Sequence, residues 1–268
     1  MKVSLTSMKK TVLALATASI LVSCATSPTG RSQLIIFPDS QLNEMGEQAF
    51  SSMKSDIKIS NQRVENALVQ CIANELLEFV PSSVFEGEWE VVVFDDAQVN
   101  AFALPGGKIG VYTGLLGVAV NQHQVAAVVG HEIGHVIARH GNERMSQSAA
   151  ASFTQQGIAA ILQSNEVAQT PLIMQGLGLA TQLGTLSYSR DHETEADIIG
   201  LDLMARAGFQ PQESVELWKN MAANSSGEKP PEFLSTHPAE STRIKNLSAN
   251  MPAATKLYNN AANKADCS

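Results

Sequence analysis

Two histidines and a glutamate occupy the segment His131-Glu132-Ile133-Gly134-His135. In an α-helix, residues four apart are separated by roughly 40° around the axis, so His131 and His135 project from one face and can hold a single metal ion. Glu132 lies beside them, close enough to take a proton from a water on that metal. The pattern therefore predicts two zinc ligands and a general base, the chemistry of metal-assisted hydrolysis. The alternative interpretation is a pair of buried structural histidines.

A catalytic zinc ion usually has three protein ligands, so a third ligand must come from another segment. The run Ser189-Arg190-Asp191-His192-Glu193-Thr194-Glu195-Ala196-Asp197 supplies acidic residues at helical spacing. Glu193 and Asp197 stand at positions i and i+4, so one could bind the metal while the other supports it from behind. Glu195 would point roughly the opposite way. The alternative interpretation is a solvated acidic face of a helix.

The two motifs together carry a resemblance to a known family. H-E-x-x-H, followed further along the chain by S-R-x-x-E-x-x-A-D at residues 189–197, is similar to the gluzincins of peptidase family M48. That family includes CaaX prenyl proteases, heat-shock membrane proteases, mitochondrial Oma-type proteases and periplasmic lipoproteins. Among these groups, the chain most resembles the periplasmic lipoproteins. The resemblance implies one Zn2+ per chain, Glu132 as general base, Asp197 orienting a ligand histidine, and three zinc ligands: His131, His135 and Glu193.

Two further segments match the family pattern. His237-Pro238 and Arg243 match its late His-Pro pair and arginine, which makes His237 a candidate for stabilising the oxyanion of the reaction. Without the family, His237 reads as a loop histidine. Asn100-Ala101-Phe102-Ala103 resembles the strand that borders the family's cleft, and could bind an extended peptide by adding it as a strand. The alternative for this segment is ordinary sheet core.

The other histidines have weaker claims to a function. If the motif helix continues to Gly141, His140 lies roughly 140° from His135 around the axis, so we expect a structural or surface role for it. His123 and His192 receive the same interpretation.

The N-terminal residues have the features of a processing signal. Three lysines accompany an apolar run that is too short to span a membrane. Leu21-Val22-Ser23-Cys24 resembles the bacterial lipobox, which predicts removal of residues 1–23 and lipidation of Cys24. Ala25, by similarity to lipoprotein sorting, favours the periplasmic side of the outer membrane, and residues 24–38 are expected to form a tether. A soluble periplasmic protein cleaved nearby is the alternative.

Composition narrows the function classes. With 44% hydrophobic and 16% charged residues, the chain is typical of a globular protein. Loss of residues 1–23 would remove three lysines and no acids, taking the net charge from −8 to −11, so nucleic acid is a poor candidate for a partner.

Cys71 and Cys267 could form a disulfide in an oxidising compartment, or Cys71 could remain a buried free thiol.

Capping residues and apolar periodicity indicate the elements that position these side chains. A helix is expected from Pro38-Asp39-Ser40. A second helix, capped by Ser60 or Asn61, is expected to run to Pro81 with an apolar stripe. That stripe consists of Val64, Leu68, Cys71, Ile72, Leu76 and Phe79.

Short β-type runs follow at residues 89–94, 99–104 and 108–112. The motif helix is bounded by Asn121 as N-cap, Gln124 in the capping-box position, and Gly141 as its stop.

Later helices are expected at residues 189–206, at 211–223 and from 239, before a tail at 251–268. Residues 142–186 read either as two packed helices or as a segment that moves and could gate the site.

These features predict a predominantly helical α+β fold, with a zincin-like metallopeptidase domain at residues 39–250 and a small sheet of about three strands beside the motif helix. The expected function is zinc-dependent hydrolysis of peptide bonds in unfolded or damaged envelope proteins, with Glu132 activating the water. The expected partners are polypeptide substrates, the membrane through the lipid anchor, and other envelope proteases or assembly factors. The alternative is a zinc-containing chaperone-like or binding lipoprotein without proteolytic activity.

Overall fold

The computed structural model describes residues 24–162, 188–224, 233, 237 and 241–267. Its contacts divide the chain into two compact units, one of residues 1–37 with 142–165 and the other of residues 38–141 with 166–268. Both predicted chemical motifs belong to the second unit. None of the helices in the described ranges combines the length and the apolar character that crossing a membrane requires.

The second unit contains a three-stranded sheet in the order β3-β5-β4. β3 (Glu90–Phe94) pairs in parallel with β5 (Lys108–Tyr112), and β4 (Ala101–Leu104) pairs antiparallel with the other edge of β5. The tight β4–β5 turn uses two successive glycines with positive φ, 83° at Gly106 and 68° at Gly107, a conformation that residues with a Cβ rarely adopt. The small predicted sheet is therefore confirmed.

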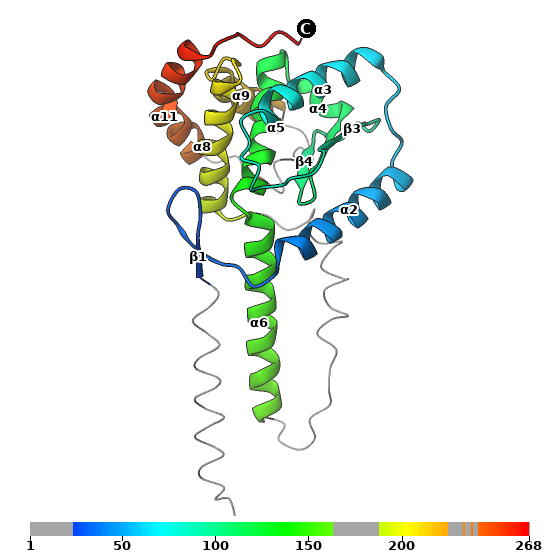
Figure 1. The fold of residues 1–268 in the computed structure, drawn as a ribbon, viewed down its shortest axis with the longest axis vertical. Coiled ribbons are helices and arrows are strands. Elements are labelled where there is room, and N and C mark those ends of the chain that lie inside the picture. The colour runs from blue at the N-terminus through cyan, green and yellow to red at the C-terminus, as the bar shows by residue number, and fades with distance from the viewer. Residues whose placement is uncertain (1–23, 163–187, 225–232, 234–236, 238–240, 268) are drawn as a thin grey trace, which may run out of the picture. The chain divides into compact units, whose positions relative to one another are not determined.

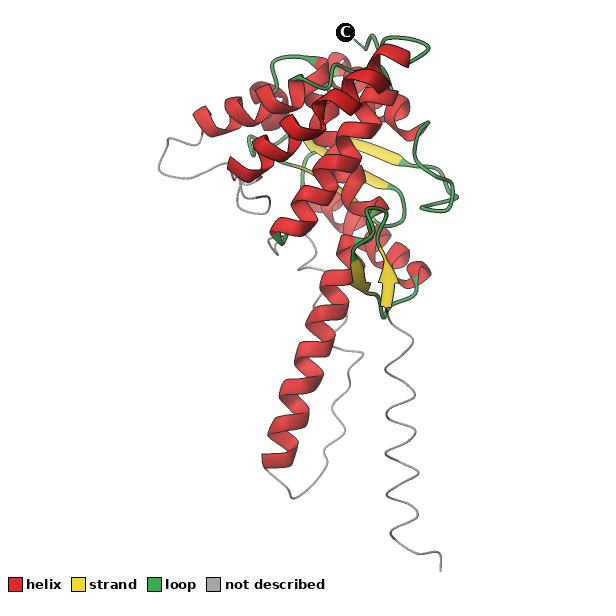
Figure 2. Cartoon of the chain, turned by 90° about the vertical axis from the view of Figure 1, so that its left-hand side faces the viewer, coloured by secondary structure: helices red, strands yellow, loops and turns green. Residues whose placement is uncertain are grey.

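Helices make up most of the second unit (Figure 2). The motif helix α5 is its central element, because it packs against β4, α3, α8 and α9. The predominantly helical α+β class predicted from the sequence is confirmed. The helices of this unit are α2 (Asp39–Asp56), α3 (Arg63–Leu77), α4 (Thr113–Val118), α5 (Gln122–Ile137), α8 (Arg190–Arg206), α9 (Glu213–Asn224) and α11 (Ser241–Asn260) (Figure 1).

The two chemistry-bearing helices begin at side-chain caps. Asn121 Oδ1 accepts a hydrogen bond from the backbone N–H of Gln124 at 3.0 Å, which starts α5. Ser189 Oγ accepts one from the N–H of His192 at 3.2 Å, which starts α8. Each cap satisfies a backbone donor that the first helical turn leaves free. The predicted starts of both helices are correct.

The predicted end of the motif helix is wrong. α5 ends at Ile137 rather than at Gly141, because Arg139 takes a left-handed conformation with φ 57°. A residue in that conformation terminates a helix as glycine usually does. Gly141 instead lies in the next helix, α6 (His140–Leu162), whose first residue is turned back toward α5.

The predicted stripe of α3 also needs correction. Val64 is 83% exposed, and Phe79, which lies beyond the end of the helix at Leu77, is 40% exposed. Gln62 is the N-cap in place of Ser60 or Asn61, and it makes no side-chain cap bond. Ile72 and Leu76 of the predicted stripe are buried as expected, and Val69 and Ala73 complete the buried face.

A disulfide joins Cys71 of α3 to Cys267, with 5.7 Å between the two Cα atoms. It closes a separation of 196 residues and fixes the segment that follows α11 to α3. α11 itself continues past residue 251, where the predicted tail begins.

The first unit contains a short hairpin of β1 (Cys24–Thr26) and β2 (Ser32–Leu34), paired antiparallel. Arg31 forms two hydrogen bonds to the carboxylate of Glu143 in α6, at 2.7 and 2.6 Å, and Gln33 Nε2 donates to the same carboxylate at 2.9 Å. The segment expected as a tether therefore contains ordered structure. The segment 142–186, expected either as two packed helices or as a moving segment that could gate the site, begins within α6, and its residues 163–186 lie outside the described part of the chain.

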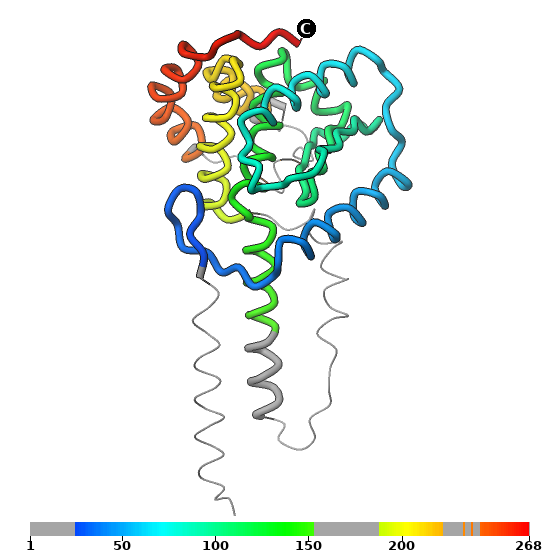
Figure 3. Tube along the Cα trace, in the orientation of Figure 1, coloured from blue at the N-terminus to red at the C-terminus, as the bar shows by residue number. Residues whose placement is uncertain are grey.

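Small residues bring α5 and α8 together (Figure 3). A Cβ placed on Gly200 would lie 2.7 Å from the backbone nitrogen of His131, and one on Gly134 would lie 2.8 Å from the carbonyl oxygen of Ala196. Real Cβ atoms do not approach backbone so closely. The two helices can therefore keep this separation only with glycine at these contacts.

We predict that Gly200→Ala destabilises the fold by about 1–3 kcal/mol, as overpacking does in a close-packed interior, because the new methyl group must push α8 away from α5. Urea unfolding of the purified protein measures the loss. Gly117→Ala is the matched control, since nothing lies within 4 Å of a Cβ at that exposed position of α4. Equal unfolding midpoints for the two variants would contradict the close contact.

Candidate metal centre

The facing sides of α5 and α8 bring the first three predicted metal ligands together. The Nε2 atoms of His131 and His135 lie 3.1 Å apart. Each is 3.5 Å from a carboxylate oxygen of Glu193, Oε2 for His131 and Oε1 for His135. All three side chains are buried. Two helices distant in sequence thus present two imidazole nitrogens and one carboxylate to a single point.

His237 adds a fourth donor to this group. Its Nδ1 lies 3.0 Å from Glu193 Oε1 and 3.3 Å from His131 Nε2, and its ring is buried. One donor atom from each of the four residues lies within 4.8 Å of the others. The predicted oxyanion role would put His237 beside the reacting carbonyl. In the structure its Nδ1 lies among the donor atoms that could hold a metal, and its Nε2 lies 3.5 Å from Glu132 Oε1.

The donor chemistry of this group fits a zinc ion. Imidazole nitrogen and carboxylate oxygen are the donors that zinc takes in catalytic sites. Two ring nitrogens that face each other across 3.1 Å can share only one proton, so the group has more lone pairs than hydrogen bonds can satisfy. A cation at this point would engage the lone pairs of His131, His135 and Glu193 together.

The buried charges favour a cation at the same point. Burial disfavours ionised Glu193, yet its contacts with the neighbouring histidines hold the pKa of its carboxyl below the usual range. Burial and Arg243 oppose protonation of His131, yet Asp197 and Glu193 raise its pKa to about 9. Burial lowers the pKa of His135 well below its usual value. The negative field that draws a proton to His131 would also attract a metal ion.

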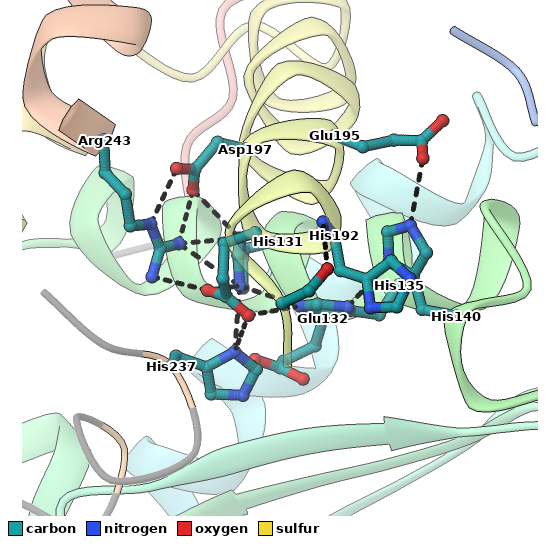
Figure 4. A network of polar contacts seen from close by, with 11 residues as sticks. His131, Glu132, His135, His140, His192, Glu195, Asp197, His237 and Arg243 are labelled. Carbon is teal, nitrogen blue, oxygen red and sulfur yellow. Dashed lines mark hydrogen bonds and ion pairs between the residues drawn. The ribbon is translucent and has the colours of Figure 1, made fainter. Parts of the chain in front are cut away.

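Asp197 and Arg243 lie behind the group and contact His131 and Glu193 (Figure 4). Asp197 Oδ1 lies 3.0 Å from His131 Nδ1, the ring nitrogen that faces away from the donor cluster. Arg243 contacts both oxygens of Asp197, at 2.6 and 2.8 Å, and Glu193 Oε2 at 2.7 Å. Its guanidinium lies 3.7 Å above the ring of Trp218. One arginine therefore fixes both carboxylates, and it holds the pKa of Asp197 low despite burial.

Glu132 lies against the group without being one of its donors. Its side chain is buried, and its Oε1 accepts no hydrogen bond from the described residues. The nearest recorded contact of that oxygen is His237 Nε2, at 3.5 Å. Burial raises the pKa of Glu132. A carboxylate with an uncommitted oxygen and a raised pKa is suited to accepting and returning a proton.

His140 and Glu195 belong to the centre although neither was assigned to it. His140 is completely buried, with its Nδ1 2.9 Å from His135 Nδ1 and its Nε2 3.1 Å from Glu195 Oε2. The expected structural or surface role for His140 assumed a helix that continues to Gly141, and the left-handed turn at Arg139 removes that assumption. No pattern in the sequence marks such a turn at an arginine.

Two aromatic side chains near the centre, Tyr188 and His192, had no predicted role in it. The ring of Tyr188 stacks on that of His135, with centroids 3.8 Å apart. His192 is buried, and its ring centroid is 4.4 Å from that of His140. His123 lies elsewhere, where its Nδ1 accepts from the N–H of Gln210 at 3.3 Å, in keeping with the structural role expected for it.

The predicted substrate strand Asn100-Ala101-Phe102-Ala103 coincides with β4, an edge strand that packs on α5. Ala101 and Ala103 are buried. Phe102 belongs to an aromatic cluster with Phe50, Phe94 and Tyr112. These side chains serve the sheet core, so recognition of a peptide here would fall to the backbone of the strand.

We predict that Glu193→Ala weakens zinc binding by more than roughly 10–100-fold. That range is the usual cost of losing a residue that only hydrogen-bonds to a ligand, whereas this substitution removes the donor that α8 supplies. Competition with a chromophoric chelator measures the affinity, and metal analysis gives the stoichiometry, expected to be one in the unaltered protein. Asp202→Ala is the matched control, since Asp202 is an exposed carboxylate of the same helix, paired with Arg206. If Glu193→Ala and Asp202→Ala bind zinc equally, Glu193 is not a ligand.

Comparison with known proteins identifies relatives that are metalloendopeptidases. Residues 63–251 match the sequence profile of "Peptidase family M48". Mitochondrial metalloendopeptidase OMA1 of Saccharomyces cerevisiae is 38% identical over 197 residues, covering 70% of this chain and 54% of the relative. The β-barrel assembly-enhancing protease of Escherichia coli is 28% identical over 207 residues, covering 75% of this chain and 42% of the relative. The chain spans about half the length of the curated relatives it matches.

The matched region contains the whole donor group and the residues that support it. Peptidases of this family use zinc, so zinc is the cofactor of this site. The profile covers more than half of the chain, and the resemblance seen in the two motifs is confirmed. The chain belongs to peptidase family M48.

Proposed function

We propose that this chain is a zinc-dependent endopeptidase that cleaves unfolded or damaged proteins of the bacterial envelope. The observation that carries the proposal is Glu132, a buried carboxylate with an uncommitted oxygen beside the donor group. A site that only stores zinc or stabilises the fold has no need of a base at that position. His131, His135 and Glu193 would hold the metal.

Each residue around the metal has its own role in the proposed reaction. When bound, zinc polarises the scissile carbonyl and lowers the pKa of water. Glu132 accepts the proton of the attacking water and later returns it to the leaving amine, for which a raised pKa is suited. His237, whose Nε2 lies on the Glu132 side of the group, is placed to stabilise the developing oxyanion. Asp197 and Arg243 keep His131 and Glu193 in position.

The proposed substrates are extended segments, bound along β4. As an edge strand, β4 pairs with β5 on one side only, which leaves backbone groups on the other side for a peptide. The carbonyl of Val99, just before β4, already accepts a hydrogen bond from the N–H of Phe233 at 3.1 Å, which supports main-chain recognition at this edge. Binding through backbone favours unfolded chains over particular sequences.

The proposed location is the periplasmic side of the outer membrane, with Cys24 as the lipid anchor. The lipobox-like sequence at residues 21–24 supports this, and more than one acyl chain would give stable anchoring. One bacterial relative is named for enhancing β-barrel assembly, which supports envelope proteins as substrates and assembly factors or other envelope proteases as partners.

We predict that Glu132→Gln abolishes hydrolysis of unfolded casein while leaving zinc bound at one ion per chain. The amide has nearly the same shape as the carboxylate but cannot accept the proton, and loss of a general base costs typically 10²–10⁴-fold in rate. Cleavage is followed by release of labelled peptides, and zinc content by metal analysis of the same sample.

Two outcomes of this comparison would contradict the proposed mechanism or the proposed activity. Equal casein hydrolysis by the zinc-loaded variant and the unaltered protein would mean that Glu132 is not the base. Absence of hydrolysis by both proteins, together with retained binding of unfolded casein, would favour the zinc-containing binding lipoprotein instead. Glu216→Gln, an exposed glutamate of α9 paired with Lys219, controls for the substitution itself and should keep full activity.

We predict that Cys24→Ser abolishes incorporation of labelled palmitate and moves the protein from the membrane pellet to the soluble fraction of cells. Cys267→Ser, which breaks the disulfide but leaves Cys24 intact, should still incorporate palmitate and sediment with membranes. A Cys24→Ser protein that remains labelled and sediments would reject the lipid anchor at this residue.

A further inference from the structure

We propose that Glu195 and His140 form a relay that orients His135 for the metal. This inference rests on the zinc site described above and assigns positioning residues to it. His140 lies between the other two side chains, 2.9 Å from His135 and 3.1 Å from Glu195, with all three buried (Figure 4).

The atoms involved determine where the protons lie. His135 directs its Nε2 toward His131 and Glu193, so that nitrogen must carry the lone pair that binds zinc. A neutral imidazole then has its proton on Nδ1, from which it donates to His140 Nδ1. His140 in turn must carry its proton on Nε2, from which it donates to Glu195 Oε2. Every donor in the relay meets one acceptor.

The opposite arrangement would prevent zinc binding. If His140 donated through Nδ1, His135 Nδ1 would have to accept, and the proton of neutral His135 would lie on Nε2, where the metal must bind. Neutral His140 carries one ring proton, and donating that proton from Nε2 to Glu195 leaves Nδ1 as an acceptor, so neutral His140 cannot form this arrangement. Glu195 therefore selects the tautomer of His135 across an intervening ring.

Helix α8 supplies a carboxylate that orients each of the two ligand histidines. Asp197 contacts His131 Nδ1 directly at 3.0 Å, whereas Glu195 reaches His135 Nδ1 only through His140. Hydrogen bonds of this kind orient a ligand imidazole and raise its basicity. α8 thus supplies the carboxylate that would bind the metal and a supporting carboxylate for each histidine.

The test is the zinc affinity of purified full-length protein, measured by competition with a chromophoric chelator. Loss of an outer partner costs roughly 10–100-fold in metal affinity, so His140→Ala should bind zinc 10–100-fold more weakly than the unaltered protein. His140→Asn places an amide oxygen near the lost Nδ1 and should recover most of that affinity. His140→Phe fills the space without an acceptor and should bind as weakly as His140→Ala.

A double variant separates the relay from simple packing. Glu195→Ala should weaken zinc binding in the unaltered background and have no further effect when combined with His140→Ala, because the relay is already broken. The absorption spectrum of bound Co2+ should change in His140→Ala and Glu195→Ala and return toward the original in His140→Asn. A purely structural role for His140 would not change the Co2+ spectrum in both alanine variants and restore it in His140→Asn.

Gln124→Ala controls for destabilisation, since Gln124 is a buried polar residue of α5 whose partners, Glu213 and Asn220, lie away from the metal group. It should unfold more readily yet bind zinc normally. The relay is rejected if His140→Ala keeps full zinc affinity, if His140→Asn is as weak as His140→Phe, or if Gln124→Ala loses as much affinity as His140→Ala. Failure of the unaltered protein to bind zinc would instead reject the metal site itself.

Discussion

The close approach of α5 and α8 is the constraint on which the rest of the site depends. Helices usually pack with their axes 8–10 Å apart, and only small side chains allow backbones to touch. Here Gly200 meets the backbone of His131, and Gly134 meets that of Ala196. This contact lets the short side chain of Glu193 reach the two histidines of the facing helix. Position 134, within the metal-binding motif, is therefore glycine because of helix packing and not because of the chemistry of the site.

Charge is the second constraint, because the contact buries several carboxylates together. Burying ionised groups is costly unless they are paired. Arg243 offsets part of the charge of Asp197 and Glu193, and Trp218 covers its guanidinium. The negative charge left over is the electrostatic reason for a cation in the centre. Fold stability and metal affinity are consequently linked, since the same arginine supports both.

The sequence predicted the parts of the site that depend on spacing within one helix. The i, i+4 pairs in α5 and α8, the N-cap of α5 at Asn121, the start of α8 near Ser189, and the short sheet are as expected. The predicted position of His140, roughly 140° around the helix from His135, is wrong because it depends on a left-handed arginine, which has no sequence signature. The buried face of α3 was predicted only in part, with Ile72 and Leu76 correct, because periodicity finds apolar stripes but tertiary packing selects which stripe is covered. Whether Cys71 pairs with Cys267 depends on where the chain end returns, which spacing does not reveal.

The most direct test of the whole interpretation is anomalous diffraction at the zinc absorption edge from crystals of the zinc-loaded protein. The structure predicts a single strong peak between α5 and α8, within about 2.0–2.2 Å of His131 Nε2, His135 Nε2 and a carboxylate oxygen of Glu193. A peak elsewhere, or one bonded to the histidines but beyond reach of Glu193, would contradict the claim that contact between these two helices builds the metal centre.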